Sequence, residues 1–264
     1  MKLWIYGDSF AVDWREPWVW QRQFANRIGV ERVYNQACAG TNNEWILKTF
    51  ADDGARQRPG DIALIFLTEP ARQWWIEDQP HLSNLSSIID TKDAQEFKNQ
   101  DPQVFDAIIN YYTYLDRPDL TDFRLAMMTD FIRVKSIERE LRLQVIPCFN
   151  MNIDWTDLYP VRGNMTFSVC DGEFASRNEI PNWYNTSIDT RANHMTLENH
   201  TVFADKLYER FTSPTGILDL EDSAWARGFL RNSDKLTHPG LCPELVQMAM
   251  EPGNSIPAEY WPKT

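Results

Sequence analysis

Short apolar runs alternate with helical spacings of apolar residues along this chain. Four runs predict buried strands, at 2–6, 33–35, 61–68 and 143–149. Strands that are apolar on both faces are typical of a parallel sheet covered by helices. The strand at 61–68 is expected to lie beside the first strand. The recurring order of strand, helix and strand predicts an α/β fold with a doubly wound sheet.

Helical segments are predicted between and after these strands. Pro17 fits the first turn of one helix and Gly29 its end. Thr121 resembles the N-cap of a long helix that runs to about Arg142. We expect this helix to cover the core with the apolar positions Phe123, Met127, Phe131, Val134, Ile137 and Leu141. A last amphipathic helix is predicted over 197–211.

Three parts of the chain have weaker patterns. Residues from about 73 to 122 lose clear periodicity and are interpreted as a helical insertion over the mouth of a site. Residues 150–190 are rich in turn formers, and residues from about 212 to 264 form a C-terminal extension. The chain of 264 residues has no obvious boundary, so we expect a single domain over 1–264.

The first strand ends abruptly in Gly7-Asp8-Ser9-Phe10. Gly7 allows the backbone to turn, and the Asp8 side chain can accept hydrogen bonds from the turn's own amides. Helix amides that follow would favour negative charge near Ser9. This arrangement suits attack by a serine and stabilisation of an oxyanion, whereas the alternative is that Ser9 merely caps the next helix.

Gly7-Asp8-Ser9-Phe10 after an N-terminal strand resembles the nucleophile block of the SGNH, or GDSL, hydrolases. That family is named for a Ser, a Gly, an Asn and a late His. The resemblance implies that Ser9 is the nucleophile and that the Gly40 amide belongs to the oxyanion hole. Asn43 is a further candidate for that hole. The alternative for this loop is that Thr41 or Asn42 simply caps the helix that follows.

The third block of the family departs from its usual form here. Many members end the corresponding strand in Gly-x-Asn-Asp, but this chain continues from Thr68 through Glu-Pro-Ala to Arg72. A divergent group of the family has a Thr followed by Pro and Arg at this place. Thr68, Asn43 or Arg72 is a candidate for the missing donor. Alternatively, Arg72 pairs only with Glu69 or Glu77.

Two late histidines compete for the role of base. His194 directly precedes the last helix, as the family's catalytic His does, and Asp189 is its nearest acid because Arg191 occupies the usual acid position. His238 has an Asp four residues before it, Asp234. We expect His194 to be the base, with Asp189 orienting it, and the pair of His238 and Asp234 as the alternative.

Charge and cysteine content narrow the class of protein. The formal net charge of −12 argues against nucleic acid or an anionic membrane as a partner. No apolar run approaches the roughly 20 residues that span a bilayer. The first residues form a core strand rather than an export signal, so a cytoplasmic protein is expected. The four cysteines are far apart and predict buried thiols, namely Cys38, Cys148, Cys170 and Cys242.

Together these features predict a three-layer α/β/α sandwich with a mostly parallel, flavodoxin-like sheet of about five strands. The resemblance implies a serine esterase that hydrolyses a short acyl ester or an acetylated carbohydrate through an acyl-enzyme, without metal or cofactor. The alternatives are a non-catalytic glycan-binding protein on the same fold and an acyltransferase. The eleven tryptophans are assigned to the core in preference to a stacking site. Oligomeric state is left open by the sequence.

Overall fold

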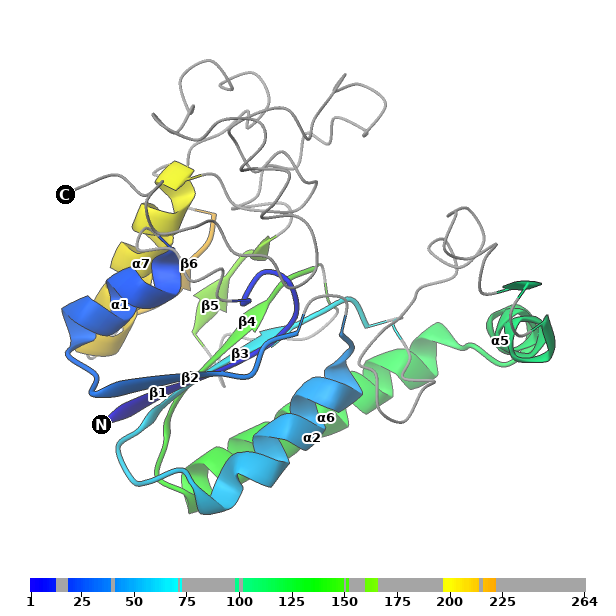
Figure 1. The fold of residues 1–264 in the computed structure, drawn as a ribbon, viewed down its shortest axis with the longest axis horizontal. Helices are drawn as coiled ribbons and strands as arrows, with labels where there is room; N and C mark the ends of the chain where they lie inside the picture. The colour runs from blue at the N-terminus through cyan, green and yellow to red at the C-terminus, as the bar shows by residue number, and fades with distance from the viewer. Residues whose placement is uncertain are drawn as a thin grey trace.

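A parallel sheet of four strands lies at the centre of the computed structural model (Figure 1). The structure describes residues 1–12, 19–38, 41–70, 72, 98–99, 102–149, 151, 160–165, 197–213 and 216–221. The strands are β1 (Lys2–Tyr6), β2 (Arg32–Asn35), β3 (Ile62–Leu67) and β4 (Arg142–Pro147). Their order is β2-β1-β3-β4, and every pair is parallel. The predicted α/β class and the pairing of the first strand with β3 are confirmed.

The register places the two inner strands where burial is greatest. Leu3 of β1 lies opposite Val33 of β2 on one side and Ile62 of β3 on the other. Every residue of β3 is buried, as its unbroken apolar run predicts. Because the chain passes from β1 to β2 and then crosses back to β3, the strand order reverses between β1 and β3. In open α/β sheets, ligands bind outside the carboxyl ends of the strands at such a reversal.

Helices pack on the two faces of the sheet. On one side are α1 (Trp20–Ile28) and α7 (Leu197–Thr212), and on the other are α2 (Asn43–Asp52) and α6 (Pro118–Glu138). Alternate strand residues point to opposite faces, which divides the buried side chains into two clusters. Leu3 and Ile5 join the cluster under α1 and α7, whereas Trp4 and Tyr6 join the one under α2 and α6.

Several local signals are confirmed. Gly29 adopts the left-handed conformation that ends α1, with φ of 71°. Asn42 caps α2 by accepting a 2.9 Å hydrogen bond from the Trp45 amide. Gly60, in the turn before β3, has φ of 82°, a conformation that favours glycine.

The predicted bounds of the long helix are wrong at both ends. α6 begins at Pro118, with Arg117 as its N-cap, instead of following a cap at Thr121. Proline lacks the N–H that a first turn leaves unpaired, and therefore fits there. The helix ends at Glu138, since Glu140 adopts a left-handed conformation and the Leu141 amide bonds back to the Ser136 carbonyl.

The predicted core face of α6 is also wrong. Phe123, Met127 and Ile137 are more than half exposed, whereas Leu125 and Ile132 are buried in the cluster with α2. The helix has two apolar sides, so spacing alone did not decide which one packs inward. The inner side also includes the buried polar residues Thr129 and Ser136, so the sequence pattern does not identify it as the side that packs inward.

Smaller elements complete the described fold. A 3₁₀ turn, η1 (Asp53–Ala55), follows α2, and α5 (Pro102–Tyr114) confirms a helix within the predicted insertion. β5 (Val161–Arg162) and β6 (Leu218–Asp219) form a separate two-stranded parallel sheet. Leu218 and Leu220 are buried in the cluster under α1 and α7, so the start of the C-terminal extension belongs to the same core.

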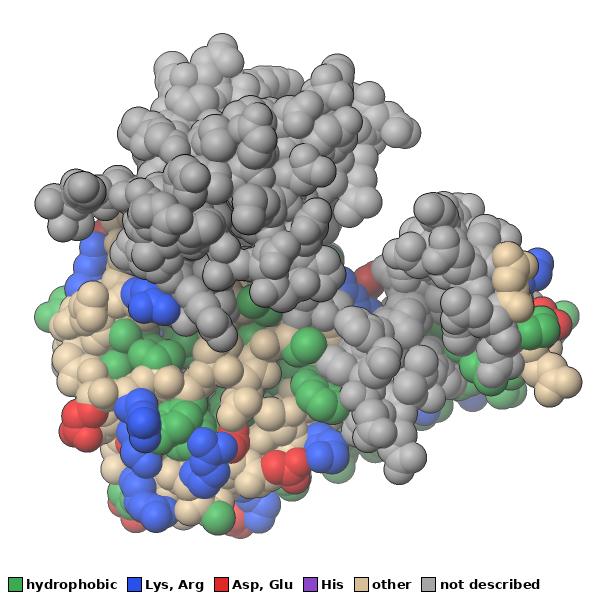
Figure 2. Space-filling model, viewed as in Figure 1, with side chains coloured by type: hydrophobic (Ala, Val, Ile, Leu, Met, Phe, Trp, Pro, Cys, Tyr) green, Lys and Arg blue, Asp and Glu red, His purple; other side chains and the backbone are tan. Residues whose placement is uncertain are grey.

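The described part of the surface carries both signs of charge. Figure 2 shows basic and acidic side chains intermixed around apolar ones on the lower part of the viewed face. Trp4 and Trp20 are fully buried, as expected of core tryptophans, and Cys148 is a buried free thiol. Cys38 is partly buried, and its pKa is raised by that burial. No helix among the described residues combines the length and apolar character needed to cross a bilayer.

Candidate functional site

The candidate site lies where the strand order reverses, beyond the carboxyl ends of β1 and β3. Ser9 is the third residue after β1, and Thr68 directly follows β3. These two strands are neighbours, with Tyr6 opposite Ile65. The sheet therefore brings together two segments that are about sixty residues apart in the sequence.

Gly7 is required by the close approach of the two strands. A Cβ atom at residue 7 would lie 2.6 Å from Cβ of Phe66 and 3.0 Å from Cβ of Ala11. Such contacts are far shorter than van der Waals distance, and their partners are a neighbouring strand and a turn. The Gly7 carbonyl accepts a 2.9 Å hydrogen bond from the Cys38 amide, which also fixes the end of β2 here.

Asp8 holds the turn that carries Ser9. Its side chain is fully buried, and Oδ1 accepts a 3.1 Å hydrogen bond from the Phe10 amide. The Asp8 carbonyl accepts from the Ala11 amide at 3.0 Å, so the predicted turn is confirmed. Ser9 is itself half-buried, and within the described part of the chain neither its hydroxyl nor its amide makes a hydrogen bond. Those two groups are therefore not committed to the described fold.

The segment after β3 holds the second oxygen of Asp8. The Thr68 hydroxyl, which is fully buried, donates to Oδ2 at 2.6 Å. Arg72 Nη1 lies 3.5 Å from the same oxygen, and Arg72 Nε lies 3.6 Å from Glu69 Oε2. Arg72 therefore pairs with Glu69 but not with glutamate alone, as the alternative expected, because it also contacts Asp8; Glu77 lies outside the described residues. Thr68 and Arg72 position Asp8 through contacts that the sequence did not reveal.

β4 contributes a further contact at this point. Cys148 Sγ, fully buried, lies 3.9 Å from Asp8 Oδ1, and the Cys148 amide donates to the Leu67 carbonyl at 2.9 Å. The Gly7-Asp8 pair consequently meets segments that follow each of the other three strands. The adjacency of β1 and β3, which was predicted, is the signal that would have indicated the bond between Thr68 and Asp8.

Asn43 joins the start of α2 to the end of β3. Its Oδ1 accepts from the Thr68 amide at 2.9 Å, and its Nδ2 donates to the Thr68 carbonyl at 3.1 Å. The oxygen and the nitrogen of the buried side-chain amide are thus both bonded to the main chain of Thr68, in the way that a residue of a neighbouring strand would be. This clamp gives Asn43 a structural role and uses one of its two amide hydrogens, so its place in an oxyanion hole stays a prediction.

Two buried polar atoms lie in the short segment that connects Gly40 to α2. Thr41 Oγ1 and Asn42 Nδ2 are both almost completely buried, and neither has a hydrogen-bond partner among the described residues. Buried polar atoms are normally paired, so an unpaired one calls for an explanation. Both residues directly follow Gly40 in the sequence, and the other side-chain atom of Asn42, Oδ1, caps α2.

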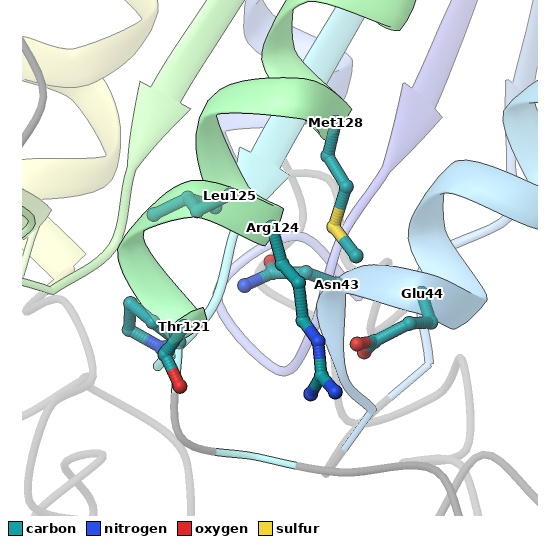
Figure 3. A pocket seen from close by; sticks show the side chains of 7 residues that line it. Asn43, Glu44, Thr121, Arg124, Leu125 and Met128 are labelled. Atoms are coloured by element: carbon teal, nitrogen blue, oxygen red, sulfur yellow. The ribbon is translucent and has the colours of Figure 1, made fainter. Parts of the chain in front are cut away.

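A small cavity adjoins Asn43 between the starts of α2 and α6 (Figure 3). Its volume is about 240 Å³ when the space open to solvent is included. Glu44 and Arg124 extend side by side at its edge, with Met128 above them. Burial raises the pKa of Glu44, an effect that the positive charge of Arg124 opposes. A hydrogen bond to the Tyr111 hydroxyl raises the pKa of Arg124.

The predicted acid–base residues cannot be placed beside Ser9. Gly40, His194, Asp189, Asp234 and His238 all lie outside the described residues. The described histidine, His200, lies on α7 and accepts a 3.2 Å hydrogen bond at Nδ1 from the Trp20 amide, which indicates a structural role between α1 and α7. The part of the chain that the structure describes contains no group of three or more residues able to hold a metal ion. Comparison with known proteins finds no matching family model, no curated relative and no solved structure.

Proposed function

We propose that this protein is a serine hydrolase that cleaves a carboxylic ester through an acyl-enzyme. The observation that carries the proposal is the position of Ser9, half-buried at the reversal of the strand order and with an uncommitted hydroxyl. The buried Asp8 carboxylate holds its turn from both sides. A nucleophile needs this combination of a fixed backbone and a free side chain.

In the proposed reaction, Ser9 Oγ attacks the ester carbonyl while His194 accepts its proton. The tetrahedral intermediate expels the alcohol, which takes that proton from the imidazolium. Water then attacks the acyl-serine, again losing a proton to the histidine, and the carboxylic acid leaves as Ser9 recovers its proton. Asp189 is proposed to orient the histidine, and the pair of His238 and Asp234 is the alternative.

The oxyanion hole is proposed to consist of the Ser9 and Gly40 amides, with Asn43 as a further donor. The Ser9 amide is not used by the described fold, and the two residues that follow Gly40 in the sequence each have a buried polar atom without a partner among the described residues. Each donor of this kind contributes about 3 to 4 kcal/mol to transition-state stabilisation in comparable sites. A Cβ at residue 40 would crowd an acyl group held against the backbone.

The finer description of the fold is part of the proposal. We propose a three-layer α/β/α sandwich with a flavodoxin-like sheet of about five strands and a single domain over 1–264. The described order β2-β1-β3-β4 and the helices on both faces support it. The resemblance to the SGNH hydrolases supports the same fold. Short acyl esters and acetylated carbohydrates are the proposed substrates.

One observation favours a second candidate, a non-catalytic glycan-binding protein. Thr68 and Arg72, two candidates for the missing third oxyanion donor, are both bonded to Asp8. If no other donor replaces them, the site binds without effective catalysis. A hydrolysis assay separates the two functions.

The test is a screen of the purified chain against p-nitrophenyl esters and acetylated sugars. Ser9→Ala should remove hydrolysis by several orders of magnitude, with an unchanged circular dichroism spectrum. Ser213→Ala, which changes an exposed serine after α7, is the matched control and should turn over normally. Gly40→Ala should lose more activity than stability. Wild-type turnover by Ser9→Ala would exclude the proposed nucleophile, and an inactive wild type across the screen would favour the binding protein.

A further inference from the structure

One guanidinium group lies where the segments that follow β1, β2, β3 and β4 come together. Arg72 is in the segment after β3, and it contacts one residue after each of the other three strands, namely Asp8, Thr41 and Phe149. Its Nη1 donates to Asp8 Oδ2 at 3.5 Å and to the Thr41 carbonyl at 3.3 Å. A single nitrogen, with one hydrogen for each acceptor, therefore connects two segments that are far apart in the sequence.

The two segments that Arg72 connects carry the two amides proposed for the oxyanion hole. Asp8 directly precedes Ser9, and Thr41 directly follows Gly40. An oxyanion is stabilised only when its donors lie at hydrogen-bond distance from the same point. The relative placement of the two segments therefore matters to catalysis, since a displacement of about 1 Å costs about a hundredfold in rate.

The main chain connects the same two segments at a second point. The Cys38 amide donates to the Gly7 carbonyl at 2.9 Å, and the Thr41 amide donates to the Cys38 carbonyl at 3.3 Å. Cys38 precedes Gly40 and is thus anchored to the end of β1. Thr41 follows Gly40 and is anchored by Arg72 as well. Arg72 therefore adds a restraint on the far side of the proposed donor.

The guanidinium of Arg72 is itself held in place. The side chain is 20% exposed, its Nε lies 3.6 Å from Glu69 Oε2, and the Arg72 amide donates to the Glu69 carbonyl at 3.1 Å. The guanidinium carbon lies 5.4 Å from the centre of the Phe149 ring, within the range of a cation–π contact. That ring packs edge-on against Phe10, the residue after Ser9. A planar guanidinium suits this place because it stacks on a ring while its edge donates hydrogen bonds.

We propose that Arg72 is a positioning residue of the hydrolase. By connecting the two segments, it sets the distance between the Ser9 and Gly40 amides. This role rests on the proposed function and deepens it. The loss of Arg72 should lower kcat more than it raises KM, because the oxyanion depends on both donors and the bound ester does not. A lysine would keep the charge beside Asp8 without the planar geometry, and should replace Arg72 only in part.

Steady-state kinetics on the best ester of the screen test this role. Arg72→Gln should lower kcat by about a hundredfold with little change in KM, and Arg72→Lys should recover part of the loss. The matched control is Arg162→Gln, which removes a guanidinium from an exposed ion pair with Asp219 and should turn over like the wild type. Unchanged kcat in Arg72→Gln, or a loss confined to KM, would overturn the role of Arg72 and leave the proposed function intact. A wild type that neither hydrolyses esters nor reacts with a fluorophosphonate would overturn both.

Hydrogen exchange followed by mass spectrometry tests the connection without depending on activity. In Arg72→Gln, exchange should become faster in peptides that contain Phe10 or Thr41, whose amides bond within the two segments. Peptides from α1 and α7 should exchange as in the wild type. Unchanged exchange in both segments would overturn the proposal, and faster exchange throughout the chain would replace it with a general structural role. If Arg72→Gln does not fold, Arg72→Lys allows the same comparison.

Discussion

Two buried aspartates at opposite ends of the sheet have nearly the same burial but different surroundings. Asp61, just before β3, accepts hydrogen bonds from the Lys2 amide at 2.8 Å and from the Trp4 indole at 3.0 Å. It also accepts from the Arg58 amide at 3.1 Å. Asp8, just after β1, accepts from its own turn and from the Thr68 hydroxyl.

The difference lies in what each carboxylate holds in place. The partners of Asp61 are main-chain amides and a buried indole, so Asp61 stabilises this end of the sheet. Asp8 holds a turn whose next residue, Ser9, keeps a half-buried hydroxyl with no partner in the described part of the chain. A buried aspartate by itself therefore indicates a structural role. The feature that indicates a reactive site is the neighbouring Ser9, whose hydroxyl has no partner in the described part of the chain.

The largest effect is expected from removing the general base for Ser9, which lies at the end of the sheet held by Asp8. His194→Ala should lower kcat/KM by several orders of magnitude, as loss of a triad member does. His238→Ala should leave hydrolysis largely intact. Steady-state kinetics on the best ester of the screen would measure both. The reverse outcome would assign the base to His238 and the orienting role to Asp234.

The paired substitutions Asp8→Asn and Asp61→Asn compare the two ends directly. Each turns one oxygen that accepts hydrogen bonds into an amide nitrogen that faces donors, which should lower the free energy of unfolding by about 1 to 3 kcal/mol. Only Asp8→Asn should also lower kcat, because only that turn carries Ser9. Urea unfolding and turnover per folded molecule give the two quantities. Equal losses of turnover would mean that Asp8 has no special relation to the site.

Thr68→Val isolates one contact of Asp8 while keeping the shape of the side chain. It removes the 2.6 Å hydrogen bond and should destabilise the fold by about 1 to 3 kcal/mol. Thr49→Val is the matched control, since its hydroxyl bonds only to the Trp45 carbonyl one turn earlier in α2. The control should cost less than about 1 kcal/mol. Equal thermal denaturation midpoints for the two variants would argue against the role given to Thr68.

The smallest effect concerns pH and Glu44. Because burial raises the pKa of Glu44 in the folded state, the charged form is disfavoured by folding. Glu44→Gln should therefore slightly stabilise the protein at pH 7, and the gain should fade as pH falls from the raised folded-state pKa to the ordinary glutamate pKa of about 4.3, below which it should be absent. Thermal unfolding across this range measures it, with Glu209→Gln on α7 as control. A gain that persists at acid pH would contradict the electrostatic explanation.

The sequence predicted the sheet well because its strands are unbroken apolar runs. The apolar run at 61–68 predicts both a strand and its pairing with the first strand, and Gly29 ends its helix as predicted. Asn42 caps α2, which was the alternative for that loop. The orientation of α6 was not predictable from spacing, because two apolar sides fit the same period. Only packing against α2 and the sheet selects the inner one.

The candidate site was predicted in part. The Ser9 turn and the hydrogen bond from Asp8 to the Phe10 amide follow from local sequence. The Thr68 hydroxyl was expected as a possible oxyanion donor, but it bonds to Asp8, a contact that depends on the sheet. The need for Gly7 was attributed to a turn, whereas the close approach of Phe66 explains it. Such contacts join residues far apart in the chain, which is why local patterns do not contain them.

The most direct test of the central claim is covalent labelling by a fluorophosphonate, followed by peptide mapping. In a serine hydrolase the activated Oγ attacks phosphorus and displaces fluoride, and an ordinary surface serine does not react. We predict one adduct, on the peptide that contains Ser9, absent from Ser9→Ala and unchanged in Ser213→Ala. An unlabelled wild-type protein, or an adduct on any other residue, would contradict the assignment of Ser9 as nucleophile.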